Sequence, residues 1–184
     1  MARKSTISLT SRMDLVAFMG AICLFLSAIE YMIPKPIPFL RVGIANVPIL
    51  LCLDVLPVPL LLLVVVLKVI GQGLIGGTLI SYVFLFSAVG SFASALSMLL
   101  FRRLFAPRIS LVGVGVLGAL FSNITQILLA RVLIFGEGAW LIAPPFLALG
   151  TVTATLLGLF AERFAARSRW LASVRSAVAA SKAL

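Results

Sequence analysis

The residues that could carry chemistry are few, and they do not form a recognisable active site. The chain contains no His, and its five acidic residues lie far apart in the sequence: Asp14, Glu30, Asp54, Glu137 and Glu162. Metal-dependent diphosphate chemistry needs clustered carboxylates that hold Mg²⁺, and His is the commonest general base and metal ligand. The sequence therefore predicts no catalytic residues, no metal site and no cofactor, and we do not expect the chain to be an enzyme.

The glycine-rich and cysteine-containing stretches add no reactive site. Residues 71–77 are rich in glycine but lack the Gly-Lys-Ser/Thr ending of a phosphate-binding loop. If the protein moves a substrate with ATP, the ATPase must therefore be another chain. Cys23 and Cys52 both lie inside apolar runs, where a lone cysteine behaves as a small hydrophobic residue and not as half of a disulfide or metal site.

A set of polar residues within the apolar segments is the strongest candidate for a binding site. Buried ionisable groups in a membrane are costly and usually face a cavity or a partner. Lys68 and Gln72 are four residues apart, and Asn123 and Gln126 are three apart, so each pair shares a helix face. We predict a ligand pocket in the outer half of the membrane, lined by Glu30, Arg41, Asn46, Lys68, Gln72, Asn123 and Gln126.

Positive charge in this set favours a ligand with an anionic group. Lys68, Arg41 and Arg131 together exceed the single negative charge of Glu30. A structural alternative stays open: Lys68 and Arg131 could extend to lipid headgroups. In that alternative, Asn123 and Gln126 would form hydrogen bonds between helices.

Small residues at helical spacing mark a candidate docking strip. Ala17 and Ala21 are one turn apart, and Gly20 widens the flat surface between them. Such spacing lets a second helix approach closely. The approaching helix could belong to a partner protein or to this same chain.

Composition indicates that the elements holding these residues lie in a membrane. The chain has 184 residues, is 62% hydrophobic and 11% charged, and has a mean hydropathy of +1.25. A soluble domain of this size could not cover so much apolar surface, whereas lipid allows apolar faces to point outward. The net charge of +10 fits a membrane surface better than nucleic acid, given where the cations lie.

The apolar residues divide into six segments, which predict an all-α, polytopic membrane protein with six transmembrane helices. Residues 1–12 form a cytoplasmic N-terminal segment, residues 13–161 the transmembrane domain, and residues 162–184 a basic amphipathic tail. The first apolar run is longer than the apolar core of a signal peptide and lacks a clean cleavage site, so we expect it to be retained. The predicted helices are 13–33, 44–55, 60–73, 79–101, 111–133 and 140–160.

The second and third segments are shorter than the roughly 20 residues that a straight span requires. They could form a helical hairpin or fuse into one kinked helix over 47–70. Charge placement favours six passes, because that arrangement puts eleven of the 15 Lys and Arg residues at the cytoplasmic side together with both termini. The tail pattern suits an interfacial helix on anionic lipid, and a frayed basic tail is the alternative.

Four motifs resemble a known family. Residues 30–38 read Glu-Tyr-Met-Ile-Pro-Lys-Pro-Ile-Pro, and residues 41–46 read Arg-Val-Gly-Ile-Ala-Asn. The other two motifs are a small-residue run at 113–118 and an Asn-x-x-Gln helix at 122–130. This pattern is similar to the Gx transporter family, also labelled heptaprenyl diphosphate synthase component I. Ile44 replaces the family's usual Leu, and Asp54, Pro57 and Pro59 stand where relatives tend to have a Gly-Trp turn.

The family is in turn similar to the S components of energy-coupling factor transporters. The resemblance implies a six-helix, S-component-like bundle in the bacterial inner membrane that binds a small ligand near its outer face. It also implies docking to a coupling transmembrane protein, itself joined to ATPase subunits, through the strip of Ala17 and Ala21. The synthase label implies a different role, that of a membrane subunit that assists long-chain prenyl diphosphate synthesis.

Three functional hypotheses follow. The leading hypothesis is a substrate-binding subunit of an uptake transporter for a small amphipathic or anionic ligand, such as an isoprenoid or quinone precursor. The alternative is a non-catalytic membrane subunit of a polyprenyl (heptaprenyl) diphosphate synthase. A scaffold without a ligand is the third.

Overall fold

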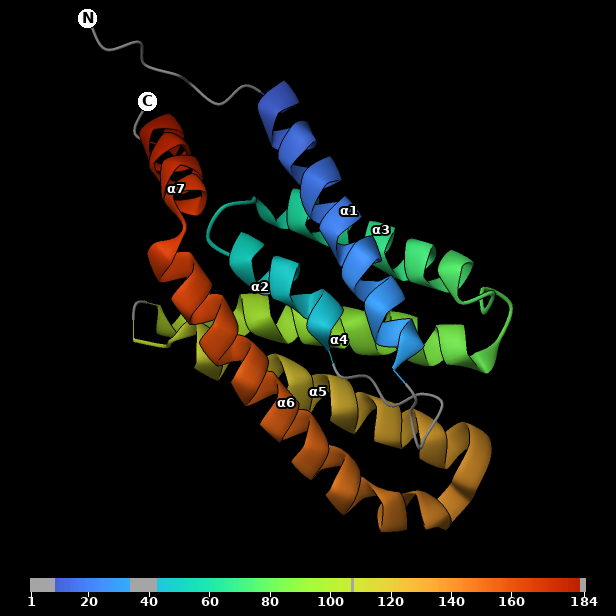
Figure 1. Ribbon diagram of the computed structural model, residues 1–184. Coiled ribbons are helices and arrows are strands. Elements are labelled where there is room, and N and C mark those ends of the chain that lie inside the picture. The colour runs from blue at the N-terminus through green and yellow to red at the C-terminus, as the bar shows by residue number, and fades with distance from the viewer. Residues whose placement is uncertain (1–8, 34–42, 107, 183–184) are drawn as a thin grey trace, which may run out of the picture.

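The predicted all-α class is confirmed by the computed structural model of the chain, which describes residues 9–33, 43–106 and 108–182 (Figure 1). Every regular element in these ranges is a helix. The elements are α1 (Leu9–Met32), η1 (Ile44–Asn46), α2 (Val47–Cys52), α3 (Val58–Ile75), α4 (Tyr82–Phe105), α5 (Leu111–Ala130), η2 (Arg131–Phe135), η3 (Gly136–Gly138), α6 (Ala139–Arg167) and α7 (Arg169–Lys182).

Four stretches are long and apolar enough to cross a membrane, namely 12–32, 58–75, 82–105 and 111–167. The last stretch contains both α5 and α6, which run side by side in opposite directions and meet at the turn formed by η2 and η3 (Figure 1). The chain is therefore a polytopic membrane protein. Its candidate spans contain the long helices α1, α3, α4, α5 and α6.

The second predicted span differs from the structure. The segment forms a 3-10 turn and then α2, a helix of only six residues, all of them buried. At 1.5 Å per residue such a helix is about 9 Å long, so it cannot cross a bilayer by itself. In Figure 1, α2 lies in the interior, between α1 and α3 on one side and α5 and α6 on the other.

The fused helix over 47–70 is also wrong, because α2 and α3 form a hairpin. The amides of Val55 and Leu56 both donate to the Cys52 carbonyl, which closes a turn at the end of α2. Pro57 then holds an extended conformation and begins α3 as its N-cap, as expected for a residue that cannot continue a hydrogen-bonded turn. The hairpin buries the short helix and leaves α3 long enough to span.

Two glycines at the end of the predicted third helix, Gly71 and Gly73, lie inside α3. A Cβ atom at Gly71 would lie 1.9 Å from Leu24 of α1, and one at Gly73 would lie 2.7 Å from Leu79. These glycines allow close packing of neighbouring segments, and α3 continues to Ile75.

The basic tail is a packed helix. α6 continues to Arg167, past the predicted end of the last span, and α7 follows after a break at Ser168. Leu171 and Val178 of α7 are buried in the main hydrophobic core, and Trp170 packs edge-on against Phe18 of α1 with ring centroids 5.6 Å apart. The frayed alternative is therefore wrong for the described part of α7.

Candidate functional site: a buried polar cavity

Six of the seven predicted ligand residues line one small cavity inside the bundle. Its volume is about 30 Å³, which is room for a guest of about the size of water. The seventh predicted residue, Arg41, lies outside the described residues. The six that converge are Glu30, Asn46, Lys68, Gln72, Asn123 and Gln126.

Glu30 holds the start of the short buried segment. Its side chain is 1% exposed, and its carboxylate accepts hydrogen bonds from the amides of Gly43 (3.2 Å) and Ala45 (3.5 Å). Gly43 has a φ of 87°, a conformation that favours glycine. An anion at the start of a helical turn satisfies amides that have no partner within the turn. Glu30 therefore fixes η1 and α2 to the end of α1.

Lys68 points into the protein and not toward a lipid headgroup. It is 3% exposed and donates hydrogen bonds to Asn46 Oδ1 and to Ser91 Oγ, the latter at 3.1 Å. These contacts join α3 to η1 and α4. The structural alternative in which Lys68 extends to the membrane surface is therefore wrong.

Gln72 joins two helices through a side-chain hydrogen bond. Its Oε1 accepts a hydrogen bond of 3.1 Å from Ser87 Oγ of α4. Gln72 is half-buried, whereas Ser87 is buried. This pair connects α3 to α4 at the edge of the cavity.

Asn123 and Gln126 retain hydrogen-bonding capacity that faces the cavity. Gln126 Nε2 donates to Ser122 Oγ at 3.3 Å, within α5 itself. Asn123 Nδ2 and Gln126 Oε1 are buried and have no hydrogen-bond partner in the described part of the chain. Since buried polar atoms are nearly always paired with protein or water, a donor and an acceptor remain for a small polar guest.

Two glycines make room for these amides, and sequence reasoning did not find them. A Cβ atom at Gly90 would lie 2.2 Å from Gln126 Nε2, and one at Gly150 would lie 1.9 Å from Asn123 Nδ2. Both separations are far too short for van der Waals contact. No sequence pattern marks a glycine in an apolar helix for such a role. Only the fold shows that the glycine lies opposite a polar residue.

Arg131 does not belong to the cavity. It lies in the π-helical turn η2 at the surface, where its guanidinium pairs with Glu137 and lies 5.5 Å from the centre of the Trp140 ring. Without Arg131, the excess of positive charge that we predicted for the pocket is smaller. The two ionisable side chains among the described residues of the lining are Glu30 and Lys68, which carry opposite charges.

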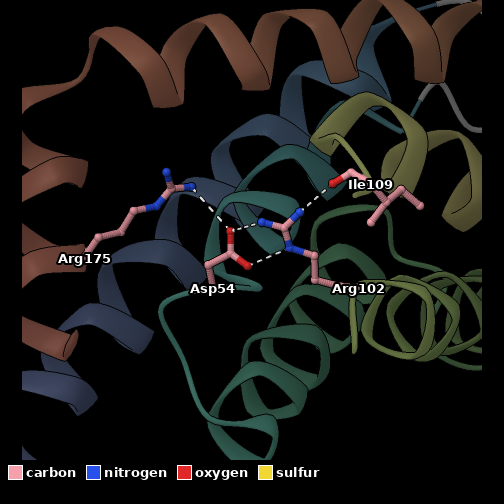
Figure 2. Close-up of polar contacts among 4 residues, drawn as sticks. All are labelled: Asp54, Arg102, Ile109 and Arg175. Atoms are coloured by element: carbon pink, nitrogen blue, oxygen red, sulfur yellow. Dashed lines mark hydrogen bonds and ion pairs between the residues drawn. The ribbon is translucent and has the colours of Figure 1, made fainter. Parts of the chain in front are cut away.

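Asp54 organises the opposite end of the bundle (Figure 2). Its two oxygens accept hydrogen bonds from Arg102 Nε and NH2, both at 2.8 Å, and Arg175 lies 3.7 Å away. Arg102 also donates to the Ile109 carbonyl at 2.8 Å. This network connects the α2–α3 turn, the end of α4, the start of α5, and α7. The sequence marked Asp54 as a departure from the family's turn but gave no sign of its partners.

Of the three residues in the predicted docking strip, two are exposed and one is buried. Ala17 and Ala21 are exposed on α1, as a docking surface requires. Gly20, however, is buried, and a Cβ atom there would lie 3.2 Å from Leu67 of α3. The assignment of Gly20 to partner docking is therefore corrected: it permits close packing of α1 on α3.

The cavity has room for a small polar group and offers it hydrogen-bonding atoms. Among residues 9–33, 43–106 and 108–182, no group of three His, Cys, Asp or Glu side chains lies close enough to hold a metal ion. Three of the five acids have structural partners: Glu30 binds backbone amides, Asp54 binds arginines and Glu137 pairs with Arg131.

Comparison with known proteins gives one match. The description "heptaprenyl diphosphate synthase component I" belongs to a family that matches residues 19–164. This range runs from α1 into α6 and includes every residue that lines the polar cavity. No curated protein and no solved structure matches the chain. Because the family match covers most of the sequence, the chain belongs to the heptaprenyl diphosphate synthase component I family.

Proposed function

We propose that the chain is a non-catalytic membrane subunit of a polyprenyl diphosphate synthase. The observation that carries this proposal is the family match over an apolar helical bundle. A long prenyl chain is itself apolar and partitions into lipid. A membrane subunit would keep the soluble catalytic subunit beside the bilayer that receives its product.

The positions of the acids support a non-catalytic role. Glu30, Asp54 and Glu137 are all engaged in structural contacts, and they lie in different parts of the fold. A diphosphate held through Mg²⁺ needs carboxylates that converge on the metal. The catalytic carboxylates are therefore expected on the partner subunit.

The partner is expected at the basic end of the bundle, in the cytoplasm. The contacts of Asp54 bring the end of α4 and α7 together with the α2–α3 turn. Exposed arginines at this end favour the cytoplasmic face of a bacterial inner membrane. Both termini and the loop at 102–108 would then be cytoplasmic, in contact with anionic lipid headgroups.

A second candidate function rests on the polar cavity. Unpaired buried polar atoms at Asn123 and Gln126 are compatible with a subunit that captures a small amphipathic or anionic ligand for uptake. Such a subunit would need a coupling transmembrane protein and ATPase subunits as partners. The cavity of about 30 Å³ would have to expand for a ligand of that class, since small-molecule pockets typically measure about 300–1,000 Å³.

Affinity purification after gentle extraction tests the two functions. Tagged protein extracted in mild detergent should recover a soluble polyprenyl diphosphate synthase, identified by mass spectrometry. Recovery of ATPases with a second transmembrane protein, and of no synthase, would favour the uptake function and contradict the proposal. An unrelated polytopic protein carrying the same tag serves as the control.

A further inference from the structure

An apolar groove lies between α1, α2 and α6, away from the polar cavity. Its volume is about 480 Å³, within the range of small-molecule sites. Its walls include Ile22 and Leu26 of α1, Leu51 of α2, and Phe160 and Phe164 of α6. Except for Ser168, the side chains around it are apolar. The groove can therefore hold a hydrocarbon chain but offers little to a polar one.

One end of the groove lies at the break between α6 and α7, where three arginines are exposed. Ser168 and Trp170 line this end. Arg163, Arg167 and Arg169 are neighbours in sequence of the lining residues Phe164, Ser168 and Trp170 and are exposed. Their side chains make no hydrogen bond or ion pair within the described part of the chain. Glu162 is the single acid in residues 139–182. The groove thus ends at a stretch of chain that carries three exposed arginines.

We infer that the groove binds a linear polyprenyl diphosphate, with the chain between α1, α2 and α6 and the diphosphate at the arginines. This inference rests on the proposed function and names the ligand that the membrane subunit would receive. Guanidinium groups bind phosphate oxygens in bidentate pairs. A terminal diphosphate carries more negative charge than the single phosphodiester of a phospholipid, so three unpaired arginines match the diphosphate better.

The Phe18–Trp170 contact gives this groove a defined wall. Both rings line the groove, and both also line a second hollow of about 510 Å³ between α1 and α7. Because α7 packs through Leu171 and Val178 into the core, the wall is part of the folded protein. The packed α7 thereby holds Ser168 and Trp170 at the groove's end, and Arg167 and Arg169 are their neighbours in sequence.

The test measures binding of all-trans heptaprenyl diphosphate to the full chain in phosphatidylcholine nanodiscs. Saturable binding is expected, and a tenfold excess of phosphatidylglycerol should not displace the ligand. Inorganic diphosphate should compete poorly, since it lacks the chain that fills the groove. Displacement by phosphatidylglycerol at equal concentration would show an ordinary lipid site and overturn the inference, as would the absence of saturable binding.

Two pairs of variants locate the site. The double variant Arg167→Gln, Arg169→Gln should weaken binding at least tenfold, whereas Arg103→Gln, an exposed arginine at the end of α4, should change it less than twofold. Leu26→Trp should fill the groove and weaken binding similarly, whereas Val152→Trp adds the same bulk on an exposed face of α6. Equal effects of variant and control in either pair would contradict the inference.

Binding and partner recovery have separate outcomes. If a synthase is recovered in the affinity purification but heptaprenyl diphosphate does not bind, the groove inference is wrong and the proposed function stands. If the ligand binds with the expected variant pattern but no synthase is recovered, the groove is supported and the subunit role is contradicted.

Discussion

At the scale of single residues, the cavity is defined by amides that face glycines. Gly150 and Gly90 leave the space that Asn123 and Gln126 occupy, and each amide has a buried polar atom without a partner in the described part of the chain. An amide that served only to join helices would have both ends paired across the interface. The arrangement therefore favours a space that admits a small polar guest, as small as one water molecule.

Adding a methyl group at Gly150 should be costly. In the variant Gly150→Ala, the Asn123 amide must move, because the new Cβ would lie 1.9 Å from its nitrogen. Overpacking of this kind typically costs about 1–3 kcal/mol. The control is Gly138→Ala, where the added Cβ meets no atom within 4 Å. Unfolding in detergent measures both, and equal stability of the two variants would contradict the packing described here.

Asp54 should contribute more to stability than an exposed acid at the same end. Asp54→Asn removes the charge that pairs with Arg102 and Arg175. Hydrogen bonds to charged groups are worth about 1.5–3 kcal/mol each when lost, so the free energy of unfolding should fall by an amount on that order. Asp14→Asn, at an exposed position, is the matched control. A loss no larger than that of the control would indicate that the network in Figure 2 does not hold the end together.

The sequence located most of the cavity because polar residues within membrane helices must face the interior. Lys68, Asn123 and Gln126 could be selected on that ground, and the structure brings them together. For Arg131 the sequence left both a pocket position and a surface position open. It lies past the last α-helical turn of α5, where η2 exposes it to the surface. Partners such as Ser91 carry no signal, since serine is common in apolar helices and only the fold sets it opposite Lys68.

At the scale of elements, the long helices follow from continuous apolar runs, while α2 does not. Apolar length alone cannot distinguish a short helix buried by protein from part of a span. Gly71 and Gly73 are unfavourable in an isolated helix, but inside α3 they allow Leu24 and Phe84 to approach closely. Tertiary packing decided both outcomes.

The exposed alanines of α1 should matter for assembly and not for folding. Replacing Ala17 or Ala21 with Leu adds bulk on a face that the bundle leaves exposed, so recovery of the partner should fall while the melting temperature stays unchanged. Ala148→Leu, an exposed alanine of α6, is the control for added surface bulk. If the Ala17 and Ala21 variants themselves unfold, the strip belongs to internal packing.

At the scale of the whole molecule, one end of the bundle is basic, and several segments of the chain contact one another there. The α2–α3 turn, the end of α4 and α7 meet around Asp54, and α1 begins beside α7 at that same end (Figure 1). The turn between α5 and α6 lies at the other end of these helices (Figure 1). This polarity supports the proposed orientation, in which the basic end is cytoplasmic.

Cysteine labelling tests the orientation. In a background with Cys23 and Cys52 replaced, Phe105→Cys and Glu137→Cys place a thiol at opposite ends of the bundle, both at exposed positions. An impermeant maleimide added to intact cells should label position 137 and leave position 105 unlabelled until the membrane is permeabilised. Labelling of position 105 in intact cells would reverse the proposed orientation.

The central claim is that the chain serves a polyprenyl diphosphate synthase as its membrane subunit, and synthase activity tests it most directly. Membranes from cells with and without the chain are washed, given radiolabelled isoprenoid diphosphate precursors, and assayed for long-chain polyprenyl diphosphate. The account predicts that membrane-bound activity falls at least severalfold without the chain and returns when the chain is restored. Unchanged membrane-bound activity in its absence would contradict the claim.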